Sequence, residues 1–261
     1  MRIAMGIEYN GSGFCGWQSQ ASGCGVQDRV ESALNSFLAA GPARISISCA
    51  GRTDTGVHAA LQVIHFDCNV ERDDVSWMRG VNAFLPPSVR ILWSRRVSDE
   101  FHARFAAQSR SYRYLLLNDA ADAAIMLGQA GWFHMPLALA PMQEAANLLL
   151  GEHDFSAFRA AECQAKSPVK TLHEAGITAS GQLFTFSFRA NAFLHHMIRN
   201  IVGGLVYVGS GRHSVADFQR IFDGRDRTLA APTFAADGLY LANIEYDKKF
   251  NLPTTRTRLP F

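Results

Sequence analysis

The feature that most constrains the fold is an order of strands and helices that occurs twice along the chain. Alternating or clustered apolar residues predict strands, and apolar residues spaced at about 3.6 predict helices. In the first half, strands are expected at 2–9, 43–50, 61–70 and 88–97, with helices at 26–40 and 73–87. In the second half, strands are expected at 109–118, 169–180, 182–190 and 238–247, with helices at 136–151, 192–209 and 214–224.

The order strand-helix-strand-strand-helix-strand is that of a ferredoxin-like unit. We therefore predict an α+β fold of two tandem ferredoxin-like units, whose sheets join edge to edge into one extended antiparallel sheet with helices packed on it. The predicted domains are 1–105, which carries the loop around Asp54, and 106–261, which completes the site. The chain contains no low-complexity linker, so the halves are expected to pack tightly.

Composition and charge exclude several classes of protein. No stretch approaches the ~20 apolar residues that a membrane span needs, and the polar N-terminus does not resemble a signal peptide, so the expected location is the cytoplasm. The net charge is only +2, but just four of the 25 basic residues are lysine, which leaves 21 arginines. Arginine is favoured for bidentate contacts with phosphate, although a GC-rich genome would also explain this bias.

The five cysteines are scattered and form no Cys-x-x-Cys pair. They predict neither a zinc site nor a disulfide framework. Cys49 lies in an apolar strand pattern and is interpreted as a small core residue rather than a nucleophile.

The loop at residues 49–59, Cys-Ala-Gly-Arg-Thr-Asp-Thr-Gly-Val-His-Ala, is the strongest candidate for chemistry. Two glycines let the backbone take conformations closed to other residues and let a ligand approach. Between them stand a cation, a hydroxyl and a carboxylate, and a carboxylate on such a turn can act as nucleophile or general base. Taken alone, the pattern also fits an Asx-turn in which Asp54 caps its own backbone.

The loop resembles the Gly-Arg-Thr-Asp-x-Gly-Val-His-Ala signature of the bacterial tRNA pseudouridine synthase A family. Further segments resemble that family in the same order along nearly the whole chain: YNGSGFCGWQSQ, VQDRVESAL, FHARFAAQSRSYRYLL, ANAFLHHMIRNIVGGL and APTFAADGLYL. The resemblance implies the pseudouridine synthase fold and an isomerase, formally an intramolecular transferase. The implied reaction converts uridine to pseudouridine at positions 38, 39 and 40 of the tRNA anticodon stem–loop, without a cofactor.

The resemblance also implies the site residues. Asp54 matches the catalytic aspartate that acts on a flipped-out uridine, and Arg199 the arginine that pairs with it. Tyr112 matches the aromatic residue that stacks on the target base, although strand alternation sends Tyr114 to the same face. Leu239 matches an apolar residue lining the uracil pocket. The remaining expected substrate-binding residues are Arg52, Thr53 and His58.

The histidines predict no metal site. His195 and His196 are adjacent within a predicted helix and would point about 100° apart, so they do not form an i, i+4 chelating pair. His58, His65 and His102 are widely spaced and lack partnering cysteines. We interpret them as structural or RNA-facing residues.

Other readings remain open. A non-catalytic RNA-binding protein of two ferredoxin-like units shares the topology, but no RNP1-type pattern is present. A pseudouridine synthase acting on another RNA is a second alternative, and a metabolic enzyme is a third, although no phosphate-binding or cofactor motif is present. The expected partner is tRNA, bound by a homodimer, with neither a membrane nor a small-molecule cofactor.

Overall fold

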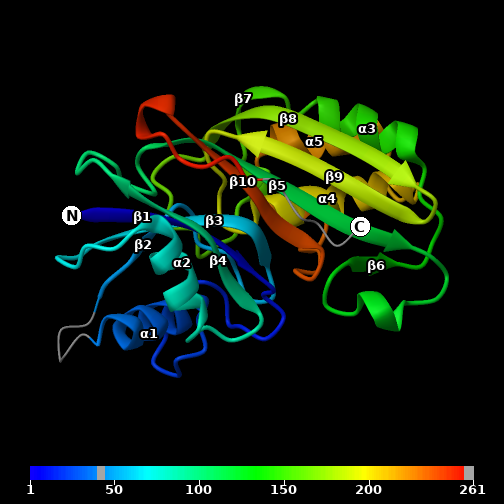
Figure 1. Cartoon of the computed structure of the whole chain (residues 1–261). Helices are drawn as coiled ribbons and strands as arrows, with labels where there is room; N and C mark the ends of the chain where they lie inside the picture. Colours follow the sequence, from blue (N-terminus) through cyan, green and yellow to red (C-terminus); the bar gives the residue numbers. More distant parts are fainter. Residues whose placement is uncertain (40–44, 256–261) are drawn as a thin grey trace. The chain divides into compact units, whose positions relative to one another are not determined.

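The computed structural model describes residues 1–39 and 45–255, which form two compact units (Figure 1). Unit 1 consists of Met1–Gln108 and Tyr240–Phe261, and unit 2 of Ser109–Leu239. The division into domains 1–105 and 106–261 stays a prediction, as does the edge-to-edge joining of the sheets. Within the described residues, no helix is long and apolar enough to cross a membrane.

Unit 1 confirms the predicted order of its strands and helices. Its elements are β1 (Arg2–Tyr9), α1 (Val26–Leu38), β2 (Ser48–Cys49), β3 (His58–Asp67), α2 (Asp74–Asn82) and β4 (Val89–Val97). The strand order β4-β1-β3-β2 is antiparallel throughout and is that of a ferredoxin-like unit. β2 is much shorter than the predicted strand at 43–50, of which residues 43 and 44 lie outside the described part of the chain.

The sheets are mixed rather than purely antiparallel, which corrects the prediction. In unit 1, β10 (Leu239–Tyr246) pairs in parallel with the start of β3, where Tyr240 lies opposite His58 and Leu241 opposite Ala59. In unit 2, β6 (Gly131–Phe133) pairs in parallel with β5 (Ala107–Asn118). Sequence periodicity does not report strand direction, so it could not predict these parallel pairings.

The core of unit 1 lies between its sheet and its two helices. α1 and α2 cover one face of the sheet (Figure 1). The fully buried ring of Trp77 on α2 lies edge-on to Phe37 of α1 and to Phe66 of β3, with ring centroids 5.5 Å away in both cases. Aromatic rings buried in this way dominate the energetics of a core, so these contacts hold both helices on the sheet.

Unit 2 follows the same scheme with additions. Besides β5 and β6 it contains α3 (Leu139–Asn147), β7 (Gly151–Asp154), β8 (Val169–Ser180), β9 (Leu183–Ala190), α4 (Met197–Gly209) and α5 (Val215–Gly224). Short 3-10 turns occur at Ala124–Met126, Ser156–Phe158 and Arg227–Leu229, and in unit 1 at Lys248–Phe250. The order β5-β9-β8-β7 is antiparallel, and the three helices cover one face (Figure 1).

The hairpin of β8 and β9 confirms its prediction. Gly181 has φ +58 in the turn, a conformation that favours glycine. Phe184, Phe186 and Phe188 are all buried on one face of β9, as the period of two requires.

Two local predictions in unit 2 are wrong, and two short strands were not predicted. α4 begins at Met197, five residues later than expected, because His196 has φ +59 and cannot belong to a right-handed helix. α3 ends at Asn147, before the expected stop at Gly151, and Gly151 instead opens β7 with φ +99. Neither β6 nor β7 was predicted, because strands of three or four residues are too short to show a period.

Candidate active site

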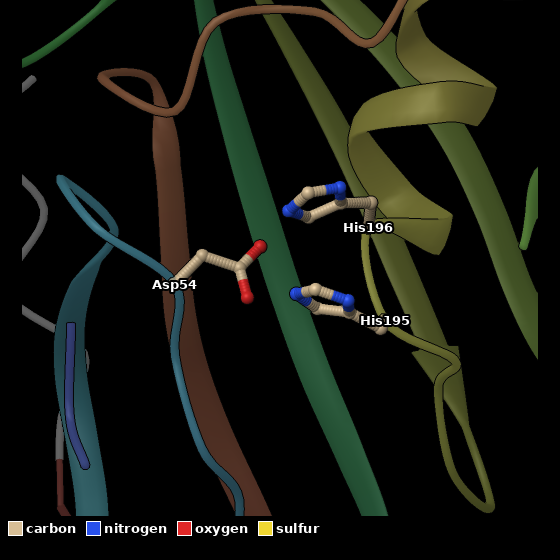
Figure 2. A group of neighbouring side chains, drawn as sticks. All are labelled: Asp54, His195 and His196. Carbon is tan, nitrogen blue, oxygen red and sulfur yellow. The ribbon is translucent and has the colours of Figure 1, made fainter. Parts of the chain in front are cut away.

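Asp54 projects from the loop that connects β2 to β3 (Figure 2). Its side chain is partly exposed, Arg52 is exposed, and Thr53 between them is buried. The loop is closed by a turn in which Val57 N–H donates to the carbonyl oxygen of Asp54 at 3.1 Å, with Gly56 at φ +80. A main-chain bond closes this turn, so its closure does not depend on the carboxylate.

The segment after β1, residues 10–25, is bonded to this loop at several points. Trp17 N–H donates to the carbonyl oxygen of Thr53 at 3.0 Å, and Gly56 N–H donates to that of Phe14 at 3.4 Å. A Cβ atom on Gly16, which has φ +91, would lie 2.7 Å from the carbonyl oxygen of Thr53. Only glycine permits this approach, so residues 10–25 and the Asp54 loop form one packed structure.

Buried side chains reinforce the same contact. The hydroxyls of Tyr9 and Thr53 are hydrogen bonded at 2.8 Å, and both residues are buried. His58, 2% exposed, accepts at Nδ1 a hydrogen bond of 3.0 Å from Gly11 N–H and stacks on Tyr240 with ring centroids 4.5 Å apart. The bond assigns the proton of a neutral His58 to Nε2. These bonds support a role for Thr53 and His58 in shaping the loop, and their contact with substrate stays a prediction.

The expectation that the cysteines form no disulfide is wrong for Cys15 and Cys24, which are linked in the structure. Their Cα atoms are 5.4 Å apart, and Cys15 N–H donates to the carbonyl oxygen of Cys24 at 3.0 Å. A left-handed turn at Gly23, φ +66, brings the chain back on itself. A spacing of nine residues without a recognised motif gave no sign of this contact.

The other cysteines of the described residues are free. Burial raises the pKa of the Cys49 thiol to about 11, so it is protonated at neutral pH. This supports the interpretation of Cys49 as a packing residue rather than a nucleophile.

Two neighbouring tyrosines on β5 have distinct environments. Tyr114 is fully buried and its hydroxyl donates to the carbonyl oxygen of Ala235 at 3.0 Å, and burial raises its pKa far above the ordinary value. Tyr112 is 9% exposed and lies edge-on to Phe193 with ring centroids 5.1 Å apart. Tyr114 is therefore a core tyrosine, and the structure leaves Tyr112 as the candidate for stacking on a base.

Arg199 lies in the first turn of α4 and is partly buried. Its Nε donates to the carbonyl oxygen of Phe234 at 2.8 Å, and Phe234 N–H donates to the carbonyl oxygen of Arg199 at 3.2 Å. The guanidinium is thus oriented by the main chain of unit 2. Leu239 is 5% exposed at the start of β10. The pairing of Arg199 with Asp54 stays a prediction.

His195 and His196 lie just before α4 rather than within a helix, so the geometric reason given against them is wrong. His196 has a left-handed backbone, and the two rings lie side by side with centroids 4.0 Å apart (Figure 2). The absence of a metal site remains a prediction. His65 and His102 are also neighbours despite their spacing, with ring centroids 4.6 Å apart.

Sequence reasoning missed two polar residues that support the Asp54 loop. Tyr9 ends β1 and bonds to Thr53, and Gln62 on β3 bonds to Gly51. A glutamine between apolar residues of a predicted strand was the available signal for the second, because buried polar side chains need partners.

The described residues show the ferredoxin-like topology that the resemblance to pseudouridine synthases implies, and the aspartate of the signature lies in a loop between two glycines. Residues 145–247 match a family described as tRNA pseudouridine synthase. The chain is 54% identical to tRNA pseudouridine synthase A of Methylobacillus flagellatus over 99% of this chain and 98% of that protein. It is 55% identical to that of Thiobacillus denitrificans over 100% and 99% of the two chains, and 54% identical to that of Chromobacterium violaceum over 97% and 96%.

These identities extend over nearly the full length of this chain and of each of the three proteins. The chain belongs to the tRNA pseudouridine synthase A family.

Proposed function

We propose that this chain isomerises uridine to pseudouridine at positions 38, 39 and 40 of the tRNA anticodon stem–loop, with Asp54 as the catalytic carboxylate. The observation that carries the proposal is the Asp54 loop. It has the family's signature, and hydrogen bonds from residues 10–25 fix its main chain on both sides of the aspartate. A fixed carboxylate is what a reaction that depends on positioning requires.

The reaction breaks the bond between N1 of uracil and C1′ of the ribose and forms one between C5 and C1′. N1 gains a proton and C5 loses one, so no electrons are gained or lost overall and no redox cofactor is required. Asp54 takes part by adding to C1′, by adding to the base, or by abstracting the C2′ proton. In each route the carboxylate must be ionised and close to the extruded nucleotide.

The remaining site residues are assigned by the proposal as follows. Arg199 pairs with Asp54 and keeps it ionised; its fixed orientation on the carbonyl of Phe234 supports this role. Tyr112 stacks on the target base and Leu239 contributes apolar lining to the uracil pocket. Arg52, which is exposed beside Asp54, contacts the phosphate backbone of the flipped nucleotide.

The substrate class sets the partners. We propose that the chain binds tRNA as a homodimer in the cytoplasm, without a small-molecule cofactor. Two copies of one arginine cluster would add their charges, which helps a chain of net charge +2 to bind a polyanion.

The test is tritium release from tRNA transcripts labelled at uridine C5. The unaltered protein is expected to release tritium, and Asp54→Asn, which is nearly isosteric, is expected to release none while still binding tRNA. Mapping of the product would then give the position.

If the folded protein binds tRNA but releases no tritium from any transcript, the function is that of an RNA-binding module. If it releases tritium only from another RNA, the chain is a pseudouridine synthase that acts on that RNA rather than on tRNA. Activity retained in Asp54→Asn would remove the catalytic role of the carboxylate.

A further inference from the structure

The main chain leaves the sheet of unit 1 just before Asp54. β2 and β3 pair antiparallel, with Ser48 opposite His65 and Cys49 opposite Ile64. One more bond continues the pairing, from Ala50 N–H to the carbonyl oxygen of Val63 at 2.8 Å. Gly51 is the next residue, and from there the chain turns away toward the catalytic aspartate.

The side chain of Gln62 bonds to both peptide groups of Gly51. Its Nε2 donates to the carbonyl oxygen of Gly51, and its Oε1 accepts from Gly51 N–H at 3.4 Å. The same Oε1 also accepts from Val63 N–H at 3.2 Å. Gln62 is fully buried and Gly51 is partly buried, so these hydrogen bonds lie at the margin of the core. A side-chain amide therefore supplies the donor and acceptor that a strand would offer, one residue beyond the end of the ladder.

This arrangement fixes the point at which the Asp54 loop begins. Gly51 stands three residues before Asp54. Between them, the carbonyl oxygen of Thr53 accepts from Trp17 N–H, and beyond Asp54 the N–H of Gly56 donates to the carbonyl oxygen of Phe14. Peptide groups that are removed from water need partners. Without Gln62, the N–H and carbonyl groups of the partly buried Gly51 lose both of these bonds, and the chain at this residue is no longer held to β3. A shift at Gly51 changes the path of the chain into Thr53 and Asp54, because the bonds of Thr53 and Gly56 to residues 10–25 hold only the rest of the loop.

We propose that Gln62 is a positioning residue of the isomerisation, which orients Asp54 through the two peptide groups of Gly51 without touching the substrate. This inference rests on the proposed function. It predicts that Gln62 affects the chemical step far more than it affects the binding of tRNA.

The test compares Gln62→Met with Gln62→Glu by steady-state kinetics, tRNA binding and thermal unfolding. Met matches the length of Gln but offers no hydrogen bond of comparable strength. Its kcat is expected to fall roughly 10–100-fold, as small displacements of a reacting group do, with KM and the Kd for tRNA changed less than about threefold. Glu keeps the acceptor for Gly51 N–H, and burial favours its protonated carboxyl, which can donate to the carbonyl oxygen of Gly51. Its kcat should therefore lie between those of Gln62→Met and the unaltered protein.

His65→Leu is the matched control. His65 lies on the same strand, is buried, and accepts a hydrogen bond from Ala103 N–H at 3.2 Å, away from the loop. It is expected to lower Tm while kcat stays within about twofold of the unaltered protein.

A purely structural role predicts that kcat follows Tm across all these variants, whereas positioning predicts that Gln62→Glu retains more kcat than Gln62→Met whatever the order of their Tm values. Should Gln62→Met not fold, Gln62→Asn replaces it, because its shorter amide cannot reach both groups of Gly51. Unchanged kcat in the folded Met or Asn variant, or a fall in kcat of the same size in His65→Leu, would overturn the proposal.

The unaltered protein and Asp54→Asn are measured first. If the unaltered protein has no activity, the proposed function is refuted rather than this inference.

Discussion

At the scale of single residues, Tyr112 and Tyr114 illustrate how environment separates side chains of one type. Strand alternation places both on the same face of β5, and so does not choose between them. The hydroxyl of Tyr114 has a main-chain partner in unit 2, while Tyr112 contacts the edge of Phe193. Substitution of Tyr112 should therefore affect mainly catalysis, and substitution of Tyr114 should affect mainly stability.

We expect Tyr112→Ala to lower kcat/KM about 10–100-fold, since stacking on one base contributes about 1–3 kcal/mol, and Tyr112→Phe to stay within a few-fold. Tyr114→Phe should lower the free energy of unfolding by about 1 kcal/mol through the lost hydrogen bond, with kcat/KM unchanged. Kinetics and denaturant unfolding of the three variants check this. A larger kinetic effect from Tyr114→Phe than from Tyr112→Ala would reverse the assignment.

The lowered pKa of His65 predicts how the stability of the protein depends on pH. Burial, reinforced by the neighbouring His102 and Arg2, lowers the pKa of His65 to about 4, against about 6.5 in an unfolded chain. Between these values the unfolded chain binds a proton that the folded chain does not. The contribution of neutral His65 to the free energy of unfolding is therefore fully present above pH 6.5 and is lost as the pH falls toward 4. The loss amounts to about 3 kcal/mol at most.

The measurement is thermal unfolding at pH 7 and pH 5 for the unaltered protein and His65→Gln, which keeps an acceptor for Ala103 N–H. The substitution should reduce the difference in Tm between the two pH values. His173→Gln, at an exposed position, is the control and should leave that difference as it is. Equal pH dependence in all three proteins would contradict the prediction.

At the scale of elements, the segment of residues 10–25 is the one that the sequence describes least well. It has no regular secondary structure, yet it fixes the Asp54 loop through hydrogen bonds of Gly11, Phe14 and Trp17. The link between Cys15 and Cys24 closes this segment on itself. Cytoplasmic thiols are generally kept reduced, so the proposed location implies that the pair exists there as two thiols.

We expect dithiothreitol to lower the stability of the oxidised protein. Closing a loop of about ten residues is worth at most about 2.5 kcal/mol in chain entropy. The double variant Cys15→Ser/Cys24→Ser should show no response of Tm to the reductant, whereas Cys68→Ser, which removes a free thiol, should respond as the unaltered protein does. A reductant effect that persists in the double variant would assign it to other cysteines.

At the scale of the whole molecule, the charge of the chain bears on how it binds its substrate. A net charge of +2 gives little overall attraction for RNA, so the proposed binding of tRNA depends on local groups of arginines and on a second copy of the chain. Binding through phosphate contacts releases counterions, and this makes affinity depend strongly on salt.

We expect the Kd for tRNA to rise by a factor on the order of 10³ between 50 and 200 mM salt if about six phosphates are contacted. Titration by fluorescence anisotropy at several salt concentrations measures the slope. Sedimentation of the protein alone tests the homodimer. A Kd that hardly changes with salt would contradict phosphate-dominated binding, and a monomer at all concentrations would contradict the dimer.

Much of the fold was accessible from the sequence because periodicity reports burial directly. The order of strands and helices in the first ferredoxin-like unit and the hairpin of β8 and β9 were predicted correctly. Within that unit, β2 is much shorter than predicted, and α2 ends at Asn82 rather than at Pro86 and Pro87. Asp54 was accessible because its loop resembles the family signature, whereas two glycines and a carboxylate taken alone also fit an Asx-turn. The start of α4 was not, since the left-handed conformation of His196 depends on its surroundings rather than on its residue type.

The sequence by itself determined the α+β class, the order of elements, the family and the candidate aspartate, because each depends on local periodicity or on a motif. Only the tertiary structure decided the parallel pairing of β10 with β3, the link between Cys15 and Cys24, and the bonds of Gln62 to Gly51. These contacts join residues far apart or in irregular segments. Whether they form depends on how the chain packs in space, which no local pattern of residues records.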